Sequence, residues 1–448
     1  IGAAATFNSP TASGRNALIN SQFTVGSVTF HSTSPTGGAS FTTNISNFNA
    51  FPSSDLLTFD EVGAGPATIT ASGPGDDNSR IQANMYFEDN VVANVTNIVG
   101  NSTAGALTLS GNISGPGGLT KTGDGMMTMA LVPGTNLGDP DAQTKAWQGP
   151  THLNGGRWRT SAGGANGMQT SSFTVNGGQL TPINSSALAS TFTFGPGSLK
   201  LSGFGATSGP FAAFEGAIRP DRVTGTNSYT ITNNVVLESS TMVHMQGFAV
   251  DDLSQTLQFN GVISGGAAAS LQISGLNSDQ NLARVVFTNA NTYEGDTIIN
   301  GGRLEVSGAS ATFGLGDIVV NNPAAVLTNG AGIAAAVSRL VIPTGVSNAI
   351  GDTATVFLGG SSRGIADLGA GIVETVGAIN FNGTLVTAAG DYSDATHPDF
   401  IDGTGIFRIL APVGQDGDHN EDGLVDAADY VLWRKLPDSY GGDQGGNN

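Results

Sequence analysis

The stretch WQGPTHLNGGRWRT, residues 147–160, decides the fold because a second copy of it lies further along the chain. YEGDTIINGGRLEV, residues 293–306, aligns with it without a gap. Both read aromatic, x, Gly, x, Thr, x, apolar, Asn, Gly, Gly, Arg, apolar. Asn and Gly tolerate positive φ, so NGG predicts a turn. The alternating apolar and polar residues on either side predict two half-buried strands.

Each long copy is followed by a shorter one, FTVNGGQLT in the first case and IVVNNPAAVLT in the second. Asn154 of the first turn recurs as Asn176, and Asn300 of the second recurs as Asn321. A spacing of about 21 to 22 residues suits one coil of a β-solenoid, in which stacked coils share an apolar interior. We therefore predict an all-β fold, an elongated β-solenoid of the right-handed β-helix type built from coils of this length. The alternative is a β-sandwich whose hairpins use the same Asn-Gly turns.

Composition agrees with a fold of short strands and tight turns, since the 448 residues include 66 Gly and only 11% are charged. A net charge of −19, from 35 acidic and 16 basic residues, would repel phosphate backbones, so we expect no nucleic-acid partner. The chain has no Cys, which excludes disulfides and thiolate metal sites. No apolar run approaches the roughly 18 to 20 residues that span a bilayer, so we expect no membrane-spanning segment.

One part of the repeat region resembles a known family. Residues 111–128 contain GGLTKTGDG between two strand-like runs, and the NGG element follows them. This arrangement is similar to the autotransporter-associated β-strand repeat of bacterial secreted proteins, as are the opening of the chain and FIDGTGIFRIL, residues 400–410. The resemblance implies a secreted β-solenoid at the bacterial cell surface and little about chemistry. The GGLTKTG element is intact once, and the Pro/Gly/Asp-rich residues 131–146 predict a projecting loop.

The chain divides into four predicted segments. They are an N-terminal β segment leading into the solenoid (1–100), the repeat solenoid (101–350), a closing β segment (351–411), and a segment with a calcium loop, a helix and a Gly/Asn-rich tail (412–448).

The last segment contains DHNEDGLVDAAD, residues 418–429, which fits the twelve-position calcium loop. Calcium takes six to eight oxygen ligands, and a Gly at position 6 permits the sharp turn. The predicted ligands, at positions 1, 3, 5, 7, 9 and 12, are Asp418, Asn420, Asp422, the carbonyl of Leu424, Asp426 and Asp429. We therefore predict calcium as the bound metal.

The end of the loop continues into AADYVLWRKL, residues 427–436, which predicts a helix with Ala428, Leu432 and Leu436 on one face. Asp429 stands where an EF-hand carries Glu, and together these features resemble one half of a type I dockerin. Dockerins pair two such loops and bind a cohesin, so the resemblance implies a cohesin-like partner. LPDSYGGDQGGNN offers no second set of ligands, so either the other half has been lost or the sequence stops before it.

We predict no catalytic residue. A glycosidase needs two carboxylates about 5 to 10 Å apart. The repeats do not supply an acidic stripe, since Glu294 and Glu305 of one copy align with Gln148 and Arg159 of the other. The five His residues show no metal spacing.

The predicted function is a non-catalytic extracellular structural protein that self-assembles into a filament or surface sheath through its terminal segments. It depends on the unpaired strand edges of a solenoid and on the lack of a polar cap at either end of the sequence. The alternative is a monomeric adhesin or carbohydrate-binding protein tethered by its calcium module. Trp147 and Tyr293 either stack on a glycan or pack on a neighbouring coil. A polysaccharide-degrading β-helix enzyme is the remote alternative.

Overall fold

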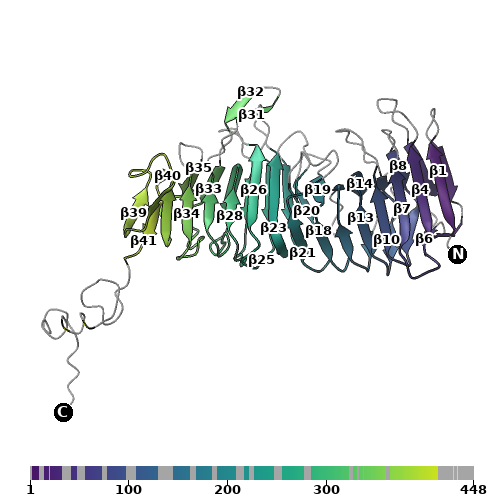
Figure 1. Cartoon of the computed structure of the whole chain (residues 1–448), viewed down its shortest axis with the longest axis horizontal. Coiled ribbons are helices and arrows are strands. Elements are labelled where there is room, and N and C mark those ends of the chain that lie inside the picture. Colours follow the sequence, from purple (N-terminus) through teal and green to yellow (C-terminus); the bar gives the residue numbers. More distant parts are fainter. Residues whose placement is uncertain are drawn as a thin grey trace, which may run out of the picture.

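The computed structural model contains almost nothing but β-strands, arranged as an elongated stack of coils (Figure 1). The residues that it describes are 3–9, 15–19, 21–32, 42–47, 56–72, 78–96, 107–129, 145–161, 168–183, 189–207, 216–220, 227–246, 255–276, 284–321, 326–329, 332–335, 338–359, 364–411, 427 and 431.

One sheet, here called the long sheet, runs the length of the stack (Figure 1). In spatial order its strands are β1 (Ala4–Ser9), β4 (Ser27–Ser32), β7 (Ala67–Ser72), β10 (Val91–Val95), β13 (Leu119–Thr122), β16 (Thr151–Leu153), β18 (Phe173–Asn176), β21 (Leu199–Gly203), β23 (Val235–Gln246), β26 (Leu271–Leu276), β28 (Thr297–Ile299), β30 (Ile318–Val320), β34 (Thr355–Leu358), β37 (Ala378–Phe381) and β38 (Thr384–Val386), with β25 (Ile263–Gly265) also paired to β23.

The remaining strands form the other walls of the stack. The first further sheet contains β19 (Gln179–Ile183), β17 (Arg157–Ser161), β14 (Met126–Met129), β11 (Leu107–Leu109), β8 (Asn78–Ile81), β5 (Thr42–Asn47) and β2 (Arg15–Ile19). The second contains β15 (Lys145–Trp147), β12 (Ile113–Gly115), β9 (Asn84–Phe87), β6 (Leu56–Phe59) and β3 (Phe23–Val25). The third contains β20 (Ser190–Phe192), β22 (Asn227–Ile231), β24 (Gln255–Phe259), β27 (Arg284–Phe287), β29 (Gly302–Val306), β33 (Ser338–Ile342), β35 (Gly364–Leu368) and β40 (Ile401–Gly403). β36 (Val373–Thr375), β41 (Ile406–Ile409) and β39 (Gly390–Ser393) form a three-stranded sheet, and β31 (Val326–Asn329) and β32 (Gly332–Ala335) form a hairpin.

The NGG turns are corners of the coil. β16 and β17, on either side of the first NGG, belong to different sheets. Each pairs in parallel with strands of the coils before and after it, as β16 does with β13 and β18. Gly156 has φ +61°, and a Cβ there would lie 2.3 Å from the carbonyl oxygen of Gly125 in the coil below. Parallel pairing confirms a β-solenoid and excludes the hairpin sandwich, whose neighbouring strands run antiparallel.

The predicted coil length of about 21 to 22 residues, a period typical of short solenoid repeats, is wrong for most of the stack. In the long sheet Thr151 pairs with Phe173 and Thr297 with Ile318, which are the two coils used for the prediction. Longer coils separate other partners, since Val91 pairs with Leu119 and Ser27 pairs with Thr68. Strands fix the cross-section of the core, but extra residues at a corner do not disturb it, so coil length is free to vary.

Inward-facing side chains of successive coils form one continuous apolar core. The burial pattern alternates along the strands, as in β7, β10 and β22, because successive side chains point to opposite faces. Aromatic rings of successive coils pack against each other, for example Phe59 and Phe87, which meet edge to face with ring centroids 5.7 Å apart. Such contacts add cohesion along the axis of a chain that has no disulfides.

The C-terminal end of the stack is closed by strands that run against the rest. β38 pairs antiparallel with β37, and β39 pairs antiparallel with β41. The prediction that neither end carries a polar cap is therefore wrong at this end, where Thr384, Gly390 and Asp391 are exposed on the closing strands. The long sheet passes through the three predicted β segments, whose boundaries at residues 100 and 350 stay predictions. No helix in the described part of the chain is long and apolar enough to cross a membrane.

Candidate functional site

The predicted calcium loop lies outside the described residues. None of its six predicted ligands is among the described residues; they are Asp418, Asn420, Asp422, Leu424, Asp426 and Asp429. Within the described ranges, no group of three or more His, Asp or Glu side chains could hold a metal ion. Calcium therefore stays a prediction from the spacing of the loop.

The aromatic residues of the two long repeats lie in the core. Trp147 and Tyr293 are both fully buried. The indole Nε1 of Trp147 donates to Thr151 Oγ1 (2.9 Å), and the hydroxyl of Tyr293 hydrogen-bonds to Thr297 Oγ1. The motif aromatic, x, Gly, x, Thr thus places a ring in the interior and its polar tip on a buried hydroxyl. Neither ring can stack on a glycan, which leaves packing as its role.

Lys121 of the GGLTKTGDG element is an interior lysine, with 0% of its surface exposed. Its Nζ donates to the carbonyl oxygens of Thr122 (2.9 Å), Gly123 (2.7 Å) and Gly155 (3.0 Å). Gly123 and Gly155 belong to the same corner in successive coils, so the ammonium group bridges two turns. Burial lowers the pKa of Lys121 to about 7, and the nearby charge of Asp124 partly offsets this. The sequence interpretation did not identify this role, although the alternation of LTKT points Lys121 inward.

Glu374 in β36 is the corresponding buried acid near the C-terminal end. Its Oε1 accepts a hydrogen bond from Ile350 N (2.6 Å), and the backbone N–H groups of Ala349 and Asn348 also contribute. Burial raises the pKa of Glu374 to about 6, as does the charge of Asp352, while the three backbone donors lower it. The carboxyl group therefore holds the 348–350 turn of the preceding coil, and it is structural.

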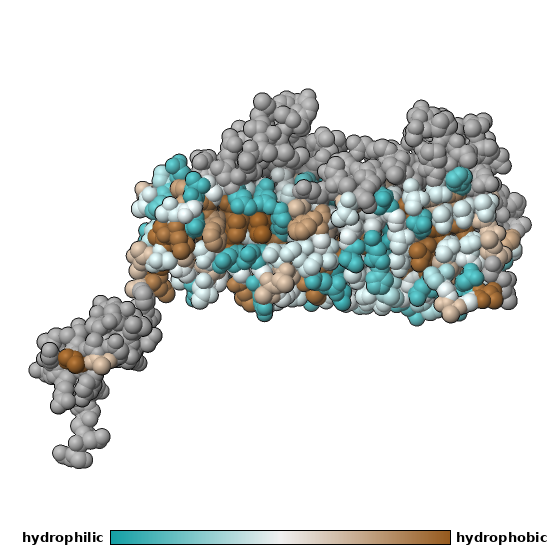
Figure 2. All heavy atoms as spheres, in the orientation of Figure 1, coloured by the Kyte–Doolittle hydropathy of each residue, from teal (hydrophilic) through white to brown (hydrophobic). Residues whose placement is uncertain are grey.

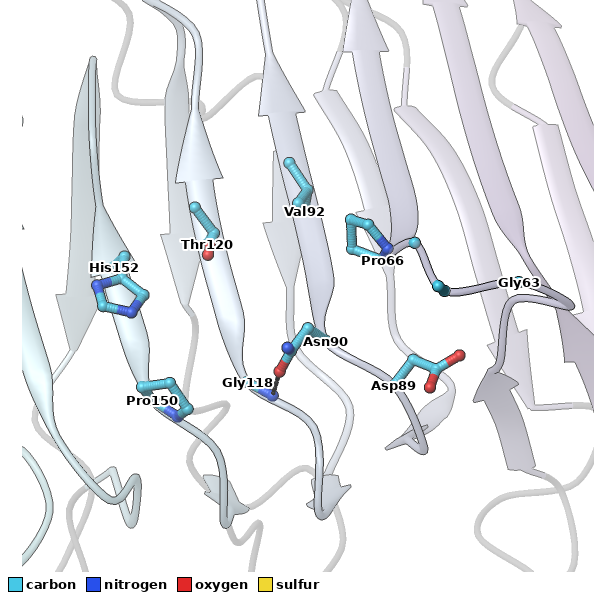
Figure 3. Close-up of a pocket in the computed structure, with 11 residues that line it drawn as sticks. Gly63, Pro66, Asp89, Asn90, Val92, Gly118, Thr120, Pro150 and His152 are labelled. Atoms are coloured by element: carbon cyan, nitrogen blue, oxygen red, sulfur yellow. Dashed lines mark hydrogen bonds between the residues drawn. The ribbon is translucent and has the colours of Figure 1, made fainter.

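A groove lies on the outer face of the long sheet in its N-terminal half (Figure 3). Val92, Thr120 and His152 occupy aligned positions on β10, β13 and β16, and all three point outward in Figure 3. The loop Gly63–Pro66 and the side chain of Asp89 complete one end. The cavity volume is about 420 Å³, large enough for a small polar ligand.

Two of the polar side chains in the groove are engaged by the backbone of neighbouring coils. Asp89 Oδ2 accepts from Glu61 N (2.7 Å), and Asn90 Oδ1 accepts from Gly118 N (2.8 Å). Asp89 is the single carboxylate among the residues that line the groove. Thr120 and His152 therefore offer hydrogen bonds to a polar ligand, but the lining does not supply the carboxylate pair of a glycosidase.

The groove belongs to a longer row of aligned, outward-facing residues across β7 to β21. This polar row, aligned strand by strand, consists of Thr68, Val92, Thr120, His152, Thr174 and Lys200. All six side chains are partly exposed. The row ends in an exposed ion pair between Lys200 and Glu238 on β23 (2.9 Å).

The C-terminal third of the same face carries the opposite chemistry. Ile298, Val319, Phe357, Asn380 and Leu385 are aligned strand by strand across β28, β30, β34, β37 and β38. We call Ile298, Val319, Phe357 and Leu385 the apolar row. Figure 2 shows apolar surface running along the rod over these strands. Leu385 is 58% exposed, and the other three are partly exposed.

Sequence inspection missed the apolar row because its members are scattered. Ile298, Val319 and Phe357 lie on three successive coils, so a whole coil of sequence separates each from the next. Each is one outward residue in a strand whose other members alternate normally. The strand register, which the structure supplies, is the signal that brings them together.

No family model, curated protein or solved structure matches this chain. The fold defines the class of the protein, an all-β solenoid of stacked parallel strands. The similarities to the autotransporter-associated repeat and to half a dockerin stay resemblances of short motifs.

Proposed function

We propose that the chain is a non-catalytic, extracellular structural protein that self-assembles into a filament or surface sheath. The apolar row is the observation that carries the proposal. Partly exposed apolar residues that are scattered singly are normal on a soluble protein, but an aligned row across successive strands indicates a contact surface.

Two properties of the rod support this role. The core is continuous, so the solenoid is a stiff element of fixed cross-section. The strands of the long sheet are aligned along the axis, which gives each copy rows of outward residues at which another copy can bind. In this proposal the coils are right-handed, the 412–448 segment binds calcium, and calcium orders that segment for assembly at the bacterial surface.

The test is the oligomeric state of the purified full chain with calcium and with a chelator. Negative-stain images and sedimentation velocity should show polymers with calcium and shorter species after chelation. Single rods under both conditions at high protein concentration would exclude self-assembly.

A monomeric, carbohydrate-binding adhesin is the second candidate, and the groove favours it. Thr120 and His152 present hydrogen-bonding groups beside a polar surface of neighbouring Thr side chains. Binding of a glycan panel that is lost in Thr120→Ala and His152→Ala variants would support this alternative. Release of reducing ends or unsaturated sugars from polysaccharides would instead indicate a polysaccharide-degrading enzyme.

A further inference from the structure

We propose that the apolar row is the docking surface for the predicted C-terminal helix, residues 427–436, of a second copy of the chain. The inference rests on the proposed self-assembly and names its contact. It joins a surface that the structure describes to the one amphipathic helix that the sequence predicts.

The helix matches the first part of the apolar row. Neighbouring strands lie about 4.8 Å apart, so Ile298, Val319 and Phe357 span roughly 10 Å. A helix rises about 1.5 Å per residue, which puts Ala428, Leu432 and Leu436 about 6 Å apart over about 12 Å. A helix laid along the rod axis can therefore place one apolar side chain near each of these three strands.

The described part of the helix is consistent with an apolar face open to a partner. Ala427 and Val431 are helical, and Val431 is 47% exposed. On a helical projection Val431 lies beside Ala428, on the same side as Leu432. The apolar face thus includes one residue that the structure shows at the surface.

The charges beside the two surfaces are complementary. Asp296 and Asp317 precede Ile298 and Val319 by two residues, so their side chains share the outer face with the row. Asp296 Oδ1 accepts from Asp317 N (3.2 Å), and Asp317 Oδ1 accepts from Thr355 N (2.8 Å), so each carboxylate is held by the backbone of the next coil. On the predicted helix, Arg434 lies beyond Val431 at the edge of the apolar face, and Lys435 lies within that face, between Val431 and Ala428. Docking with this flank toward the aspartates sets the direction of the helix.

The linker permits the contact. The last described strand, β41, ends at Ile409, and residues 410–417 lie between it and the predicted calcium loop. These residues can span up to about 27 Å when extended, which is the reach of the linker once calcium orders the loop. The predicted helix and the described row are different surfaces, so docking that does not close into a reciprocal dimer is heterologous and repeats from copy to copy, as a filament or sheath requires.

Complementation between two full-chain variants tests the inference. The row variant, Val319→Thr with Phe357→Thr, keeps strand-forming residues and an intact helix. The helix variant, Leu432→Ser with Leu436→Ser, keeps an intact row. Sedimentation velocity with calcium should show each variant associating about tenfold or more weaker than wild type. An equimolar mixture should form heterodimers that do not grow, because it contains one intact contact.

Val92→Thr is the matched control, since it makes the same change on the same face outside the apolar row. It should assemble like wild type, and circular dichroism should show unchanged strand content in every variant. Polymers formed equally well by the row variant would overturn the inference and leave self-assembly intact. A mixture that stays monomeric would also overturn it, because the helix would then bind its own chain or another surface. A monomeric wild type would overturn both the inference and the proposed function.

Discussion

The outer face of the long sheet is mostly polar over β7 to β21 and mostly apolar over β28 to β38, although the inner face is mostly apolar along both stretches. Thr120 and His152 represent the first region, and Val319 and Phe357 the second. The core explains every inward residue, but it places no demand on the outward ones. The difference between the two regions supports the proposal that the polar surface meets water or a polar ligand and that the apolar one meets another apolar surface.

The largest expected effect comes from core substitutions, which test whether the core is equally well packed in the polar and the apolar region. Leu153 in the polar region and Ile299 in the apolar region are both fully buried on the long sheet. Leu153→Ala and Ile299→Ala should each lower the free energy of unfolding by about 3 kcal/mol, because each leaves a cavity in a packed coil. Urea denaturation measures the loss. A loss confined to one variant would show that the core itself differs between the regions.

The second prediction concerns the buried lysine of the polar region. Its pKa is lowered to about 7 from the ordinary value of 10.5, so the unfolded chain binds more protons between these two pH values. The free energy of unfolding should therefore rise with pH, on the order of 2 kcal/mol between pH 7 and pH 9. Lys121→Met should remove this slope when both proteins are unfolded in urea over that range. An identical slope in the variant would assign the pH dependence to other groups.

The third prediction concerns Glu374, whose raised pKa should make stability fall with rising pH instead of rise. The pKa of Glu374 is raised to about 6, so the folded chain binds more protons between pH 4.5 and pH 6. The stabilisation is complete below the unfolded pKa and is lost as pH rises through the folded value. We expect a decline on the order of 1 kcal/mol, measured as the difference between wild type and Glu374→Gln over this range. A difference that grows with rising pH would contradict the raised pKa.

Much of the fold could be predicted from the sequence, because the solenoid follows from one local motif and one spacing. Asn154, Gly155 and Gly156 form a corner in the structure, and Gly156 has the positive φ that the motif predicts. Coil length could not be predicted from two coils, since corner insertions leave the core unchanged. The two surface features, the groove and the apolar row, were harder to predict than the coil length. The groove and the apolar row each combine residues from several coils, and only strand register aligns them. The calcium loop was predicted from spacing alone and stays a prediction.

The smallest expected effect on stability comes from two surface substitutions that make the polar region resemble the apolar one. Thr120→Val with His152→Ile would join Val92 to make a second apolar row of three aligned residues in the polar region. All three positions face outward, so the free energy of unfolding should change by less than about 0.5 kcal/mol. If an aligned apolar row is sufficient for docking, sedimentation velocity should show stronger self-association than wild type, with extra branching in negative-stain images. Association unchanged from wild type would mean that the flanking carboxylates Asp296 and Asp317, which the engineered row lacks, are needed to hold the docked helix in place.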